Sequence, residues 1–211
     1  MVEKAQVNLR NKKISFKRAT RFFFKVHLYF LVFFMGTIVN IDDWEEGSIN
    51  TIYILLFFSV LFIAFGTIIA LFKPSPNRNK KIHINWKEPK EIWGMGICVV
   101  ALTLFSCIFI PIVPFPSTII LVIFVFNGVL ATVSLLLHPA IIYSYELNVY
   151  GEAQTVHDYV YKYVALITSN VNYRIQLELS VLPYVVNKLL ALLFVAYIVW
   201  MASGFIITFG E

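Results

Sequence analysis

The sequence is poor in charged residues. Of its 211 residues, only 14% are Asp, Glu, Lys or Arg, whereas 59% are hydrophobic. A soluble domain carries about 25% charged and about 45–50% apolar residues. This composition excludes an ordinary soluble globular domain, and the mean hydropathy of +0.78 favours a membrane protein. A chain of this length allows one helical bundle and little else.

Cysteine is also scarce. The two cysteines, Cys98 and Cys107, lie in the same apolar run. A helix would place them too far apart for the geometry of a disulfide bond. We therefore interpret both as small buried hydrophobic residues, which carry no information about the redox compartment.

Residue patterns that carry chemistry are missing as well. The four histidines form no H-x-x-H or H-x-x-x-H pair, which excludes the histidine boxes of a di-iron enzyme. None of the apolar runs described below contains Asp or Glu. Gly94 and Gly96 in WGMGI do not make the G-x-G-x-x-G pattern of a dinucleotide-binding loop. We expect no enzymatic activity, no cofactor and no metal site.

Long apolar runs are what the sequence does contain. A helix needs about 20 mostly apolar residues to cross a hydrocarbon core of roughly 30 Å. Five runs approach that length: 22–41, 52–72, 93–110, 117–137 and 189–207. The proline-rich PIVPFPS stretch predicts a turn between the third run and the fourth. The sequence thus predicts an all-α integral membrane protein of about five transmembrane helices, four of them forming two hairpins in residues 22–137 and the fifth lying in 189–211.

Lys and Arg are distributed unevenly between the connecting segments. Eight of the 17 lie within residues 1–25 and six between Lys73 and Lys90, whereas the acidic loop NIDDWEEGSIN has none. Because cytoplasmic loops are enriched in Lys and Arg, we expect a cytoplasmic N-terminal arm (1–21) and a cytoplasmic linker (73–91). The segment 138–188 is then cytoplasmic too. For the membrane we favour the endoplasmic reticulum or another endomembrane, with the plasma membrane second.

Residues 149–168, VYGEAQTVHDYVYKYVALIT, have a different pattern. Apolar residues recur at steps of three and four, which predicts an amphipathic helix. Glu152, Thr155, Asp158 and Lys162 occupy the opposite face. We expect Asp158 and Lys162 to pair, an interaction worth about 0.2–0.5 kcal/mol on an exposed helix.

This helix is predicted to lie at the cytoplasmic interface. Seven of the eleven tyrosines fall between Tyr143 and Tyr173, and tyrosine favours the headgroup layer. With a single lysine, the helix has little attraction to anionic lipid. Its apolar face therefore packs on its own bundle, docks on a partner subunit or rests in the interface. The residues of the expected docking face are Val149, Val156, Val160, Tyr163, Val164 and Ile167.

Few polar residues stand out near the apolar runs. Asn127 lies near the middle of the fourth run, where its amide needs a partner, either in a neighbouring helix or along a transport path. Pro139 is expected to end that span directly after His138, because proline has no N–H for the helical ladder. The cations expected to contact lipid headgroups are Arg78, Lys80, Lys81 and Lys188.

Three functions remain open. The first is a non-catalytic accessory subunit with a stabilising, regulatory or assembly role, whose partners are other integral membrane proteins and lipids. The second is a small channel, transporter or lipid-transfer component that uses Asn127 and Lys188. The third is a lipid-modifying enzyme, which would need His138, His157, Asp158 and Lys188 to converge. Nucleic-acid binding is not expected, because each basic cluster flanks an apolar run and is explained by membrane orientation.

Overall fold

The computed structural model describes residues 14–46, 48–72, 82–180 and 182–209. Within these ranges all regular structure is helical, as the sequence predicts. The helices are α1 (Phe16–Ile38), the short 3₁₀ helix η1 (Ile41–Asp43), α2 (Ser48–Phe72), α3 (Pro89–Cys107), α4 (Ser117–Tyr150), α5 (Val156–Thr168), α6 (Asn170–Leu179) and α7 (Tyr184–Phe209).

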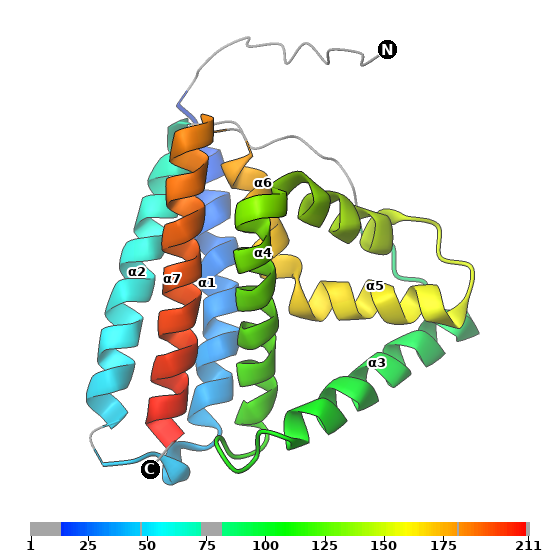
Figure 1. The fold of residues 1–211 in the computed structure, drawn as a ribbon, viewed down its shortest axis with the longest axis horizontal. Coiled ribbons are helices and arrows are strands. Elements are labelled where there is room, and N and C mark those ends of the chain that lie inside the picture. Colours follow the sequence, from blue (N-terminus) through cyan, green and yellow to red (C-terminus); the bar gives the residue numbers. More distant parts are fainter. Residues whose placement is uncertain (1–13, 47, 73–81, 181, 210–211) are drawn as a thin grey trace.

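Four long helices stand side by side and form the bundle. They are α1, α2, α7 and the first half of α4 (Figure 1). Helix α7 packs on both α2 and α4, and α1 packs on α2. Apolar side chains from α2, α4 and α7 form the buried clusters between them: Ile52, Leu55 and Met201 in one, and Ala131, Phe194 and Ile198 in another.

Hydrogen bonds between distant segments define the two ends of the bundle. At one end, the Ser15 N–H donates to the Leu71 carbonyl at 3.2 Å, which joins the start of α1 to the end of α2. At the other end, the Ser48 hydroxyl donates to the Thr208 carbonyl at 3.0 Å, close to the acidic loop. We call these the basic-linker end and the acidic-loop end. The first two helices thus form the predicted hairpin.

Within the part of the chain that the structure describes, four helices are long and apolar enough to cross a membrane: α2, α3, α4 and α7. They support the assignment as a multi-pass membrane protein. The predicted count of five differs from these four, because the run 22–41, most of which lies in α1, is not among the helices identified in the described residues. Helix α1 begins earlier than that run, with Lys17 and Arg21 in its first turns, and ends at Ile38.

Helix α3 begins four residues earlier than predicted. It starts at Pro89 rather than near Trp93, and proline is well suited to the first turn of a helix because its missing N–H is not needed there. This earlier start brings Glu91 into a helix that is apolar enough to span a membrane. Glu91 thus lies in the first turn of α3, just before the predicted run 93–110, which itself contains no carboxylate.

Helices α3 and α5 lie outside the bundle, and we call them the arm. In Figure 1, α3 runs obliquely away from the foot of the bundle and α5 lies across the space between α3 and α4. Helix α5 packs on both α3 and α4. It begins at Val156 and not at Val149, because Thr155 and Asp158 form a capping box, whereas residues 149–150 end α4.

Close contact between α3 and α5 requires a glycine in α3. A Cβ atom on Gly94 would lie 2.4 Å from the Tyr159 Cβ and 3.1 Å from the Val156 carbonyl oxygen. Two residues later, a Cβ atom on Gly96 would meet nothing within 4 Å. The two glycines of WGMG thus differ in role, and only Gly94 sets how closely the arm helices approach.

The substitution Gly94→Ala is expected to destabilise the protein, whereas Gly96→Ala is its matched control. Overpacking of a tight contact costs about 1–3 kcal/mol. Alanine gains about 1 kcal/mol over glycine in a helix at either position, so Gly96→Ala should be neutral or stabilising. Thermal unfolding of both variants in detergent measures the difference. Equal midpoints for the two variants would contradict the close contact at Gly94.

Candidate functional site

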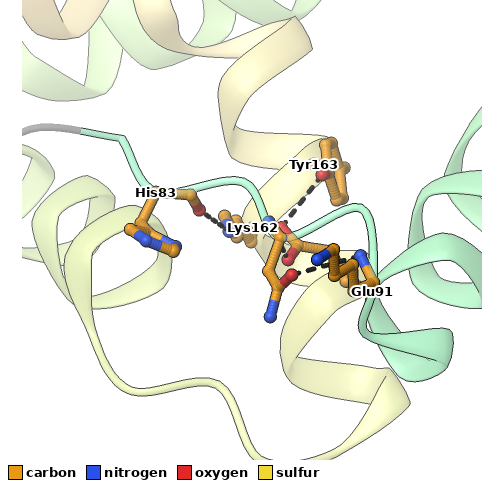
Figure 2. A network of polar contacts seen from close by, with 6 residues as sticks. His83, Glu91, Lys162 and Tyr163 are labelled. Carbon is orange, nitrogen blue, oxygen red and sulfur yellow. Dashed lines mark hydrogen bonds and ion pairs between the residues drawn. The ribbon is translucent and has the colours of Figure 1, made fainter.

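A buried ion pair joins the two helices of the arm (Figure 2). The Lys162 Nζ of α5 lies 2.6 Å from the Glu91 Oε1 of α3, and the two side chains are only 8% and 3% exposed. Removing two charges from water is costly unless each charge gains good partners. The surroundings of the pair therefore decide whether it can exist.

The surrounding groups complete the hydrogen bonds of both charges. Lys162 also donates to the His83 carbonyl at 2.6 Å. Glu91 accepts from the Tyr163 hydroxyl at 3.0 Å and from the Asn85 N–H at 2.8 Å. We call these five residues the latch. It ties α5 both to the first turn of α3 and to the segment that precedes α3 (Figure 2).

The position of Lys162 corrects the sequence analysis. The predicted pair with Asp158 was wrong, because Asp158 caps its own helix, accepting from the N–H groups of Gln154 and Thr155. Lys162 is buried rather than exposed on a polar face. One signal was available, since Glu91 and Lys162 are opposite charges beside apolar segments, and such charges need partners when they are buried. Sequence spacing did not show that they partner each other.

The latch also changes the acidity of Tyr163. Burial raises the pKa of its phenol, and the hydrogen bond to the Glu91 carboxylate raises it further, to about 12. A neutral phenol can donate to the carboxylate, whereas a phenolate would repel it. Tyr163 therefore acts as a permanent donor to Glu91 over the whole physiological range of pH.

The remaining residues of the predicted docking face lie on two helices. Val149 belongs to α4, where it joins a buried cluster with Ile142, Tyr145, Ala165 and Tyr173. Those on α5 other than Tyr163 are half-buried: Val156, Val160, Val164 and Ile167. Since α5 packs on α3 and α4, part of this apolar face is covered by the protein itself.

A break in α4 brings Lys188 into contact with the backbone. Leu137 leaves the helical conformation (φ −112°, ψ 40°), and Pro139 has no N–H to offer the Leu135 carbonyl one turn earlier. The Lys188 Nζ of α7 donates to that carbonyl instead. The predicted end of the fourth span at Leu137 coincides with this break, but α4 continues beyond it to Tyr150.

A hollow of about 720 Å³ lies beside the break. Its polar lining includes His138, Glu146, Tyr184, Asn187 and Lys188. The Lys188 Nζ is 5.7 Å from the centre of the Tyr184 ring, within the range of a cation–π contact. Of the four cations expected to contact headgroups, Lys188 therefore faces this hollow. The other three, Arg78, Lys80 and Lys81, lie outside the described residues.

Asn127 bridges two helices. It is 3% exposed, its Nδ2 donates to the Ile123 carbonyl at 2.8 Å, and its Oδ1 accepts from the Asn172 N–H at 3.1 Å. Asn172 lies in the first turn of α6, which packs on α4 and α7. The bond therefore supplies one of the partners that the free N–H groups at the start of α6 require.

Among the described residues, no group of three or more His, Cys, Asp and Glu side chains is placed to hold a metal ion. Cys98 and Cys107 are both free thiols, Cys98 buried and Cys107 exposed. No protein family model matches the chain, and neither the curated proteins nor the solved structures contain a match.

The substitution Lys162→Met should destabilise the protein by about 3–5 kcal/mol, because it leaves the Glu91 carboxylate buried without a cation. The double variant Glu91→Gln/Lys162→Met should recover most of this loss, since no charge stays buried. The amide oxygen can accept from the Asn85 N–H, and the Tyr163 hydroxyl can turn to accept from the amide NH2. Chemical unfolding of the wild type, Glu91→Gln, Lys162→Met and the double variant completes a double-mutant cycle, which measures the interaction free energy of the two side chains. Simply additive effects would show that the two side chains do not interact.

The pH dependence of the latch follows from Tyr163. Because its pKa rises from 10 to about 12 on folding, the neutral phenol stabilises the folded state below pH 10, and this contribution is lost as the pH rises through 12. Ultraviolet titration of phenolate in the wild type and in Tyr163→Phe isolates this group. The difference between the two curves should titrate near 12, and a difference centred near 10 would contradict the contact with Glu91.

Proposed function

We propose that the chain is a multi-pass membrane protein that acts as a non-catalytic accessory subunit, and that its arm docks on another integral membrane protein. The observation that carries this proposal is the position of α3. This apolar helix lies outside the bundle, although it is long and apolar enough to cross a membrane (Figure 1).

Much of the surface of α3 is apolar and uncovered. Trp93 is 69% exposed, Val100 58% and Leu104 66%. Apart from its packing on α5, the helix contacts α4, as between the Phe105 and Phe126 rings, whose centroids are 5.7 Å apart. Within a membrane such a surface faces lipid or the helix of another protein.

The latch favours a protein partner over lipid. A surface that contacts only fluid acyl chains needs no fixed orientation, whereas a docking surface gains affinity when it is ordered before binding. The buried ion pair and the glycine contact hold α3 at one position relative to α5. The Lys90 Nζ adds a further tie, donating at 3.1 Å to the Gln154 carbonyl just before α5.

The orientation is part of the proposal. The Lys and Arg residues of segments 1–25 and 73–90 place the basic-linker end in the cytoplasm, together with the N-terminus. The acidic-loop end then lies on the opposite side. The endoplasmic reticulum remains the favoured membrane, followed by the plasma membrane.

The hollow beside the α4 break supports the second candidate, a channel, transporter or lipid-transfer component. Helices broken within the membrane often form solute sites, and here Lys188 and His138 both line such a break. The enzyme candidate gains less support, because His157 and Asp158 are not among the residues lining this hollow. These two candidates therefore rank below the accessory subunit.

Site-specific photo-crosslinking tests the docking of the arm. A photoreactive amino acid at Val100 of α3 is compared with one at Val199 of α7, since these valines are similarly exposed (58% and 54%). With the protein at native expression, we expect Val100 to give a discrete adduct with one membrane protein, and Val199 to give none. Mass spectrometry of the adduct identifies the partner.

Three results would overturn the proposal. The first is crosslinking of Val100 to lipid alone, which would make α3 a lipid-facing helix. Another is an equal set of adducts from both positions, which would show non-specific proximity. The last is a purified particle with the mass of the chain by itself or of its homo-oligomer, which would exclude a hetero-complex.

A further inference from the structure

Four polar residues follow one another where α6 packs on α4, and we call them the polar row. They are Asn127 and His138 on α4, and Asn172 and Gln176 one turn apart on α6. The Gln176 Nε2 donates to the Asn172 Oδ1 at 3.3 Å, and the Asn172 N–H donates to Asn127. The His138 ring lies beside Gln176. The row thus extends from the α4 break to the middle of the first half of α4.

The polar row contains buried atoms without a well-formed hydrogen bond within the described residues: the Asn172 Nδ2, the Gln176 Oε1 and both ring nitrogens of His138. The His138 ring is near enough to the Gln176 side chain for one weak contact between them, and that contact still leaves the Asn172 Nδ2 and the second imidazole nitrogen without a partner there. Asn172 and Gln176 are both 0% exposed. A buried polar atom without a partner costs about 1–3 kcal/mol, and native proteins leave few of them. A partner at this position is therefore required.

The orientation of the amides does not remove the need for a partner. If both amide groups were flipped, Asn172 would donate to Gln176, and the Asn172 oxygen and the Gln176 nitrogen would be left over instead. In either orientation one donor and one acceptor remain. The other atom of this kind, the Thr118 Oγ1, belongs to the opposite end of α4 and does not contribute.

The hydrogen-bond donors and acceptors left over in the polar row match what a water molecule can bind. A neutral imidazole offers one donor and one acceptor, so the row as a whole presents donors and acceptors in equal number. An anion would need donors only, and a metal cation would need several oxygen ligands. Water both donates and accepts, and buried waters typically make about three hydrogen bonds to such groups.

The polar row meets the hollow beside the α4 break at His138. His138 belongs both to the row and to the lining of the hollow beside the α4 break. The hollow is also lined by Tyr184 and Lys188 at the start of α7, which places it toward the basic-linker end. On the other side of Asn127, the buried residues Leu121 and Val122 of α4 are apolar. Along α4 the row therefore ends at Asn127, and the next buried polar side chain in that direction is Thr118, near the acidic-loop end.

We propose that the polar row is a hydrated half-path: water enters through the hollow at the basic-linker end, binds between His138, Gln176 and Asn172, and stops at Asn127. This site is independent of the proposed docking of the arm. It gives the interior of the bundle contact with solution on one side only, and it makes His138 the group through which that solution can exchange protons with the interior.

Thiol accessibility tests the half-path. Gln176→Cys is prepared in a Cys107→Ser background, and the fully buried Cys98 serves as the dry internal control. Ala131→Cys, a fully buried apolar position on α4, is the matched control variant. In sealed vesicles, (2-sulfonatoethyl) methanethiosulfonate on the basic-linker side should modify Cys at 176 at least about tenfold faster than either control, because the reactive thiolate forms only in contact with water.

Each outcome of the thiol-accessibility experiment either supports or overturns the half-path. Rapid modification from the basic-linker side, with none from the acidic-loop side, supports the half-path. A rate at position 176 equal to that of Cys98 overturns it, and so does equal modification from both sides. If Gln176→Cys fails to fold, the test is the rate of deuterium exchange at the imidazole C2 carbon of His138 in the wild-type protein. Exchange of His138 within about tenfold of the exposed His157 supports the site, and a retained hydrogen overturns it.

Discussion

Burying an ammonium group and a carboxylate together is costly, and the latch shows how the chain meets that cost. The Lys162 Nζ donates directly to the Glu91 Oε1 at 2.6 Å. Tyr163, Asn85 and the His83 carbonyl supply further hydrogen bonds to the two charged groups. Hydrophobic packing alone would allow α5 to slide or rotate on α3, because it has no direction. The charged groups are directional, so the latch fixes the register between the two helices. The position of the arm, and hence the surface it exposes, depends on this pair.

The break in α4 is the second feature that determines how the helices are arranged. A proline within a long helix frees a carbonyl and removes a donor, and in an apolar setting that carbonyl must find another partner. Lys188 provides it for Leu135, which ties α7 to the point where α4 changes direction. The same break leaves room for the hollow and brings His138 next to α6. A local break in one helix is therefore accompanied by a hollow with a polar lining.

Much of the fold was predictable because apolar runs and their flanking charges obey simple constraints of length and solvation. The runs 52–72 and 189–207 fall within α2 and α7, and the proline-rich stretch separates α3 from α4. The boundaries at Pro89 and Val156 were missed because a proline at the first turn and a capping box decide them locally. The latch was not predictable from spacing, since Glu91 and Lys162 are brought together only by the tertiary fold. The need of Asn127 for a partner was predictable, but the identity of that partner, a backbone N–H of α6, was not.

Helix α4 contributes both to the bundle and to the packing of the arm. Its first half packs on α7 within the bundle, and its second half continues toward the arm, where α5 packs on it (Figure 1). The second half of α4 therefore supports the arm, because its buried residues Ile142, Tyr145 and Val149 pack with Ala165 of α5. The two parts of the molecule meet at the break, where the Lys188 Nζ donates to the Leu135 carbonyl and His138 lines the hollow. One continuous helix thus sets the angle between the bundle and the arm, and that angle is fixed at a single interrupted turn.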